Sequence, residues 1–232
     1  ANDLAGLYHS LGRLSDAEPL QRLVVRGRLE LLGPSHIDSL SSLFNLAVLL
    51  SDRGKHAEAE DMKRTVLRDF EESLGPSDPL VMSAMGSLAA TLMNMQKHRE
   101  AESLFRRVLA RRDADLGPRH PDTLCTVNNL AGLLQAMGNN TEAEPLFRRV
   151  LEGREIVLGA EHPETAGART NLALVLYALE RLVEAEPLLR EAQRGLERTL
   201  GRDHVNTLCV QSNLAELLAK LDEHEEAETL SW

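Results

Sequence analysis

Apolar residues recur along the whole chain at helical spacing, in two alternating kinds of segment. One segment, residues 121–136, has apolar side chains at Leu124, Val127, Leu130, Ala131 and Leu134. The next, residues 141–158, has them at Ala143, Leu146, Phe147, Val150 and Leu151. Spacings of three and four residues are typical of amphipathic helices. Only short polar turns separate the segments, so we predict antiparallel helix pairs. Below, the helix that opens each pair is called first-type and the other second-type.

The two-helix pattern repeats every 42 residues. A glycine marks this interval, and glycine readily takes the left-handed conformation that ends helices. The marking glycines are Gly33, Gly75, Gly117, Gly159 and Gly201. We therefore divide residues 1–232, taken as a single array, into a partial repeat 1–32, full repeats 33–74, 75–116, 117–158 and 159–200, and a final incomplete repeat 201–232. The division predicts eleven full or nearly full helices and a partial twelfth, which begins after a turn in the last repeat and contains Trp232. Both ends fall inside a repeat, which predicts a piece of a longer array or ends that partners cover.

Polar residues at the start of each first-type segment predict helix capping. The sequence His120-Pro121-Asp122 places proline at the first helical position and an acid in the first turn, and both favour a helix start. The residue before that proline recurs as histidine or aspartate, which we interpret as an N-cap. Its copies are His36, Asp78, His120, His162 and His204.

Three motifs resemble the tetratricopeptide repeat, in the 42-residue form found in kinesin light chains. They are Leu-Gly-x-x-His-Pro-x-Thr at residues 116–123, Asn-Asn-Leu-Ala at 128–131 and Glu-Ala-Glu-Pro-Leu-Phe-Arg-Arg at 142–149. The resemblance covers essentially the whole chain. It implies an all-α, right-handed tetratricopeptide superhelical solenoid, in which first-type helices line a concave groove. Such grooves commonly bind an extended or helical peptide of a partner.

This mapping assigns a set of residues to the groove. They are Phe44, Asn45, Val48, Ser87, Asn128, Asn129, Gln135, Asn171, Leu174, Tyr177 and Asn213. Asparagine amides both donate and accept hydrogen bonds, so a row of them suits a peptide backbone. The alternative is that these amides cap or pair locally within the helix stack. The groove columns hold few cations, with Lys220 as the main one, so we expect a neutral to mildly apolar polypeptide ligand. Phe44 and Tyr177 would be its aromatic contacts.

A ladder of arginines invites a different interpretation. These residues, 42 apart, are Arg22, Arg64, Arg106, Arg148 and Arg190. Each follows a glutamate by four residues, a spacing at which an ion pair stabilises a helix by a few tenths of a kcal/mol. We therefore predict solvated ion pairs rather than a basic binding patch.

Composition and charge exclude several classes of function. The chain is 43% hydrophobic and 27% charged, as in ordered soluble proteins, and its net charge of −10 disfavours nucleic-acid binding. No His, Cys, Asp or Glu cluster has the spacing of a zinc site, and no glycine-rich phosphate loop is present, so we predict no metal, cofactor or catalysis. Cys125 and Cys209 lie two repeats apart and are predicted to be unpaired, which favours a reducing compartment. The apolar runs are too short to span a bilayer.

Together these observations predict a non-catalytic interaction module that binds a partner polypeptide in its groove. Two alternatives stay open. One is a structural subunit of a large multiprotein assembly, held by its edges and back. The other is the sensor array of a regulatory nucleotide-binding ATPase. The expected location is intracellular and cytoplasmic, with organelle import left open because Ala1 is not an initiator methionine.

Overall fold

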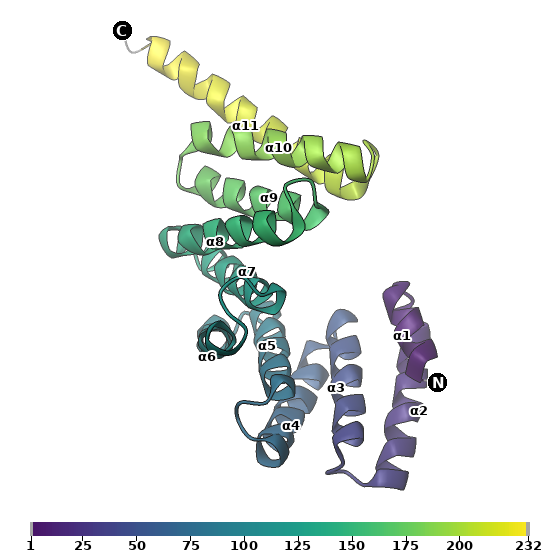
Figure 1. Ribbon diagram of the computed structural model, residues 1–232. Coiled ribbons are helices and arrows are strands. Elements are labelled where there is room, and N and C mark those ends of the chain that lie inside the picture. The colour runs from purple at the N-terminus through teal and green to yellow at the C-terminus, as the bar shows by residue number, and fades with distance from the viewer. Residues whose placement is uncertain (1, 231–232) are drawn as a thin grey trace. The chain divides into compact units, whose positions relative to one another are not determined.

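The computed structural model describes residues 2–230, and side chains from residue 4 to residue 222. Every regular element in this range is an α-helix (Figure 1). Internal contacts divide the chain into a first unit, residues 1–111, and a second unit, residues 112–232. The first contains α1 (Asn2–Ser10), α2 (Leu14–Leu32), α3 (Ile37–Asp52), α4 (His56–Leu74), α5 (Pro79–Asn94) and most of α6 (His98–Asp115). The second contains α7 (Pro121–Ala136), α8 (Asn140–Leu158), α9 (Pro163–Ala178), α10 (Leu182–Thr199) and α11 (Val205–Leu230).

Consecutive helices pack against each other within each unit. The first unit pairs α1 with α2, α2 with α3, α3 with α4 and α4 with α5, while the second pairs α7 through α11 in the same serial way. Turns of a few residues join these helices, so each lies antiparallel to the one before it. The predicted all-α class and its antiparallel pairs are confirmed.

Small and branched residues in fixed columns form the core. The alanines of the Leu-Ala pair are fully buried at Ala47, Ala89, Ala131 and Ala173, as are those of the second-type helices at Ala59, Ala101, Ala143 and Ala185. An alanine at a helix crossing lets the two backbones approach closely. In α7 all five predicted apolar positions are buried. In α8 the buried stripe is narrower, because Leu146 and Leu151 remain partly exposed.

The predicted caps are present at the start of each first-type helix from α3 onward. Nδ1 of each capping histidine accepts a hydrogen bond from the backbone N–H two residues later, at 3.1–3.2 Å. Asp78 does the same through Oδ1, at 2.8 Å from the nitrogen of Leu80. The glycines that mark the repeat have φ between 85° and 93°. A residue with a Cβ rarely takes that conformation, so the 42-residue interval is partly a backbone requirement.

The last helix differs from the sequence-based expectation. The pattern predicts a turn near residue 222 and a separate second-type helix after it, but α11 continues to Leu230. In earlier repeats this turn has a residue with positive φ, at Gly12, Gly54, Gln96, Gly138 and Glu180. Asp222 takes that place here, and Glu223 replaces the cation that follows the turn in most repeats. Without a glycine or that cation's ion pair, helix propagation continues through the position.

Candidate functional site

The predicted groove residues all lie on first-type helices, and none is buried. Asn45 is exposed, and the other ten are partly exposed. Those in the first unit are Phe44, Asn45 and Val48 on α3 and Ser87 on α5. Those in the second are Asn128, Asn129 and Gln135 on α7, Asn171, Leu174 and Tyr177 on α9, and Asn213 on α11. The adjacent Leu-Ala pairs of α3, α5, α7 and α9 are buried, so each of these helices presents one face to solvent and another to the core.

Two asparagines of the second unit are linked across helices. Nδ2 of Asn171 on α9 donates to Oδ1 of Asn128 on α7, at 3.0 Å. This bond uses one donor of Asn171 and one acceptor site of Asn128, so both amides retain further capacity. Local pairing, the alternative interpretation of the asparagine row, is therefore real at this position, but it consumes only part of each amide.

The two free cysteines lie close to this row. Both are exposed, and both occupy the same column on α7 and α11. Sγ of Cys125 is 4.0 Å from Nδ2 of Asn129, one helical turn further on. Cys209 precedes Asn213 by the same four residues. The thiols therefore report directly on access to Asn129 and Asn213.

A cluster of charged and aromatic side chains surrounds Tyr177. The ammonium of Lys220 lies 4.6 Å from the centre of the tyrosine ring, within the range of a cation–π interaction. The phenol hydroxyl donates to Glu216 at 3.2 Å. Desolvation by the protein and, after it, the nearby Glu216 carboxylate raise the pKa of Tyr177. Lys220 also forms an ion pair with Glu180 at 2.8 Å, so the cation predicted for the groove is engaged locally.

A cavity in the first unit opens among residues at the repeat positions assigned to the groove. It has a volume of about 230 Å³, and Asn45 and Val48 of the predicted groove line it. Its other lining residues are Ala5, Gly6, His9, Gln21 and Leu49. In the 42-residue alignment, Gly6 corresponds to Leu174 and His9 corresponds to Tyr177, four repeats later. Sequence reasoning missed this cavity, although Gln21 stands where three later repeats have phenylalanine or leucine.

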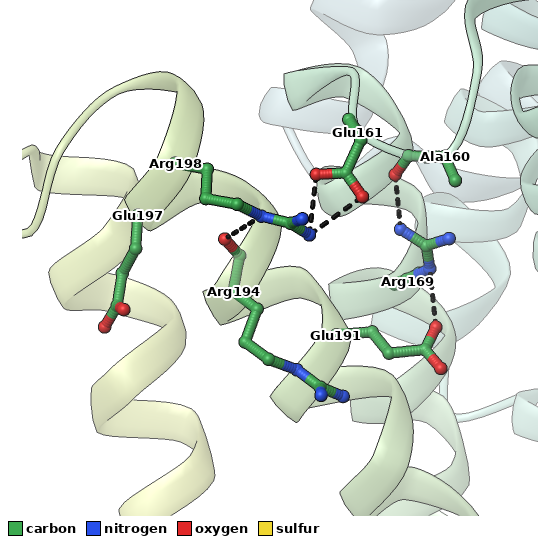
Figure 2. A pocket seen from close by; sticks show the side chains of 7 residues that line it. All are labelled: Ala160, Glu161, Arg169, Glu191, Arg194, Glu197 and Arg198. Atoms are coloured by element: carbon green, nitrogen blue, oxygen red, sulfur yellow. Dashed lines mark hydrogen bonds and ion pairs between the residues drawn. The ribbon is translucent and has the colours of Figure 1, made fainter.

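A larger pocket, of about 520 Å³, lies in the second unit between α10, α9 and the turn that precedes α9 (Figure 2). Its lining consists of Ala160, Glu161, Arg169, Glu191, Arg194, Glu197 and Arg198. Arg169 is buried, and its guanidinium contacts the carbonyl of Ala160 at 2.7 Å and the carboxylates of Glu155 at 2.6 Å and Glu191 at 3.2 Å. Arg198 pairs with Glu161 at 2.6 Å. Most of the pocket's charges are thus neutralised within its own walls.

The equivalent pocket one repeat earlier has three of its charges reversed. It has a volume of about 530 Å³, and Arg119, Arg149 and Glu152 line it. These residues correspond to Glu161, Glu191 and Arg194 in the 42-residue alignment. There Arg119 pairs with Glu152 at 3.3 Å and Arg149 pairs with Asp113. Because the signs change while the pairing persists, we interpret these pockets as polar contacts between helices and not as ligand sites.

The arginine ladder forms the predicted ion pairs. Each arginine contacts the glutamate four residues earlier at 2.7–3.0 Å. Some of these arginines also reach the next repeat: Arg22 contacts Glu58 and Arg64 contacts Glu100, both at 2.8 Å, and Arg148 contacts Glu184 at 3.4 Å. Burial alone would raise the pKa of Glu18, but hydrogen bonds from Lys55, Arg22 and Arg53 lower it to about 2. These charges serve the repeats themselves, which agrees with the ion-pair interpretation. Glu18 and Glu60 are buried, however, so their pairs are not solvated as predicted.

Two further classes of site are absent from the described residues. No group of three or more His, Cys, Asp or Glu side chains there is placed to hold a metal ion. No helix in that part of the chain is long and apolar enough to cross a membrane.

Known proteins place this helical repeat in a family. The tetratricopeptide repeat model matches residues 1–72, 80–155, 122–198 and 164–231. Among solved structures, one is described as the TPR-like repeats, nearly identical to one another, of a kinesin light chain from Podosopora anserina. It is 26% identical to this chain, with a TM-score of 0.72 over 86% of this chain and 94% of that one. BtubC (BKLC) from P. vanneervenii is 18% identical, with a TM-score of 0.77 over 93% of this chain and 87% of that one. No match is found among curated proteins.

The fold and these matches define an all-α solenoid protein built from helix pairs. The chain belongs to the tetratricopeptide repeat family, with kinesin light chain-like repeats among its structural neighbours. Members of this family are generally non-catalytic modules for protein–protein interaction.

Proposed function

We propose that this protein binds a partner polypeptide on the exposed face of its first-type helices. The observation that carries the proposal is the row of asparagine side chains on the first-type helices of the second unit, here called the asparagine row. Asn128, Asn129 and Asn171 are partly exposed in helix interiors, where asparagine is a mediocre helix former. Their amides keep free donors and acceptors after the Asn171–Asn128 bond is counted. A polypeptide backbone is the ligand that such a row satisfies without regard to side-chain sequence.

The preferred segment is neutral to mildly apolar. Lys220, the main cation near the row, is engaged by Tyr177 and Glu180, so it offers little to an acidic ligand. Leu174 and Tyr177 supply apolar contact area next to the amides. In the first unit, Phe44 and Val48 play the same part beside Asn45 and Ser87.

The experiment substitutes Asn129→Arg and Asn171→Arg together and measures partner capture from cell extract by affinity purification. We expect capture to be lost while the helical circular dichroism signal is unchanged. Ile156→Arg is the matched control, because Ile156 is 58% exposed on the second-type helix α8. Undiminished capture by the double variant overturns the proposal.

The native thiols give an independent readout on the purified complex. Cys125 and Cys209 are exposed, so both react with iodoacetamide in the free protein. A polypeptide lying on the asparagine row would slow alkylation of both, as measured by mass spectrometry. Crosslinks confined to loops and second-type helices, with unchanged thiol reactivity, would indicate the assembly-subunit role instead.

A further inference from the structure

The cavity between α1, α2 and α3 arises from one core position that is filled in later repeats. In the 42-residue alignment Gln21 corresponds to Lys63, Phe105, Phe147 and Leu189. Phe147 and Leu189 are each 1% exposed and close the slot in the second unit. Gln21 is 5% exposed, and its amide nitrogen donates to the carbonyl of Ser42 at 3.2 Å. Because its side chain is tied there, about 230 Å³ stays open, several times the roughly 30 Å³ of one water.

The second repeat shows what chemistry this slot accommodates. Lys63 is 2% exposed, and its ammonium donates to Oγ1 of Thr91 at 2.7 Å and to the carbonyl of Ser87 at 3.2 Å. Thr91 and Ser87 correspond to Leu49 and Asn45, which line the open cavity. The stack of first-type and second-type helices therefore holds a lysine ammonium at this place, with methylenes packed against the core.

The open cavity has the two features that a lysine side chain needs. Ala5, Gly6, Val48 and Leu49 offer an apolar wall for the methylenes. Gln21 keeps its Oε1 acceptor without a hydrogen-bond partner among the described residues, and Asn45 adds a second amide. A cavity with an apolar wall and a few polar atoms is typical of a side-chain pocket.

A carboxylate next to the cavity provides a negative field. His9, which lines the cavity, holds Asp52 through Nε2 at 2.7 Å. The charge of Asp52 also acts on Lys63, in the equivalent slot of the second repeat. Burial lowers the pKa of Lys63 to about 8, and Asp52 opposes that shift. The net charge of the whole chain, −10, also favours cationic groups over anionic ones.

We propose that this cavity binds a lysine side chain of the partner polypeptide, with Gln21 and Asn45 as the acceptors of its ammonium. The proposal rests on the proposed function, because the cavity opens among the columns assigned to the groove. It adds one cationic position to a ligand that is otherwise neutral to mildly apolar. Gln21 is then a specificity-determining residue of the first unit.

The test uses a single-residue probe, N-acetyl-lysine N-methylamide, with the whole chain. Binding is followed by two-dimensional NMR through the backbone amides of Gly6 and Asn45 and the side-chain amide of Gln21. We expect saturable shifts at millimolar concentration, as befits one side chain. The matched probe N-acetyl-norleucine N-methylamide, which lacks the ammonium, should bind at least about fivefold more weakly. Equal binding by the norleucine probe, or no shift with the lysine probe, overturns the proposal.

Variants of the slot provide the second arm. Gln21→Phe and Gln21→Leu introduce the residues of later repeats, so they should fill the cavity, preserve folding and abolish lysine-probe binding. Lys63→Met, which keeps the second slot filled, should leave it unchanged. Probe binding that persists in both Gln21 variants overturns the proposal. Its failure is distinguishable from failure of the proposed function, which is tested at Asn129 and Asn171 in the other unit.

Discussion

Nδ2 of Asn171 donates to Oδ1 of Asn128 at 3.0 Å, linking α9 to α7 on their exposed side. The two residues are 43 apart, so the bond joins neighbouring columns of successive repeats. It fixes the orientation of both amides. It thereby holds their remaining donors and acceptors in place, and under the proposed function these are the groups that would bind a polypeptide backbone.

A double-mutant cycle on this pair should separate its structural and binding roles. We expect Asn171→Ala and Asn128→Ala each to lose a bond worth about 0.5–1.5 kcal/mol, offset in part by the better helix propensity of alanine, and the double variant to lose less than the sum of the two. Urea denaturation measures these values. Partner capture should fall in both single variants by more than the stability change explains. Additive stability losses would mean that the bond contributes nothing in solution.

Lys63 should make the free energy of unfolding rise with pH in the alkaline range. Its pKa in the folded chain is about 8, below the ordinary 10.5. Between these values the unfolded chain holds a proton that the folded chain releases, so stability should rise as pH increases through this window. Lys63→Met removes the buried charge and should stabilise the protein by about 1–3 kcal/mol near neutral pH. This advantage should shrink as pH approaches the unfolded pKa, as chemical denaturation across a pH series would reveal. A constant advantage would contradict the account.

Glu18 should make the free energy of unfolding fall as the solution is acidified. Its pKa is about 2 in the folded chain against an ordinary 4.5, so its contribution is complete above about 4.5 and disappears as pH falls toward 2. Glu18→Gln should therefore destabilise the protein by about 1–3 kcal/mol at neutral pH and flatten the acid limb of its stability profile. Glu186→Gln is the control, because that side chain is 30% exposed and its ion pair with Arg190 is on the surface. The control should change stability by under about 1 kcal/mol.

Two helix-interior glycines should respond oppositely to alanine. A Cβ at Gly153 would lie 2.7 Å from both methyl carbons of Leu124, a buried residue of α7. Gly153→Ala should therefore cost about 1–3 kcal/mol through the forced repacking. A Cβ at Gly195 meets no heavy atom within 4 Å. Gly195→Ala should stabilise by about 0.5–1 kcal/mol through reduced chain entropy and better helix propensity. Thermal unfolding of the two variants tests both signs, and a shift in the same direction would refute the packing argument.

The regular parts of the fold follow closely from the sequence. The helix predicted at residues 121–136 has those bounds, and the histidine caps and arginine ion pairs occupy their predicted places. These features depend on residue spacing within one helix or one repeat, so they can be predicted directly from a periodic sequence. The predicted turn at residue 222 was wrong, because the pattern there lost its glycine and its following cation while the period continued.

The cavity and the buried cations could not be predicted from the groove columns. Gln21, Lys63 and Arg169 occupy core positions at which most other repeats have apolar residues. That mismatch is visible in the alignment of the repeats. Its outcome depends on where each long side chain finds a partner. Lys63 reaches Thr91 and fills its slot, Arg169 reaches two glutamates, and Gln21 leaves space.

One acidic position near the end of α4, α6 and α8, held by Glu71, Asp113 and Glu155, receives its counter-charge in more than one way. Arg107 contacts Glu71 at 3.8 Å and Arg149 contacts Asp113, both from the second-type helix of the next repeat. Glu155 instead receives Arg169, from the next first-type helix, while Glu191 takes the place of the earlier arginine.

Repeats 75–116, 117–158 and 159–200 thus each supply an arginine to the acid of the repeat before, although the arginine lies on different helices. Duplication of residues 117–158 or 159–200 would therefore create a new junction in which the acid at this position again has an arginine within reach. An array built in this way can lengthen by gene duplication without first evolving a new interface.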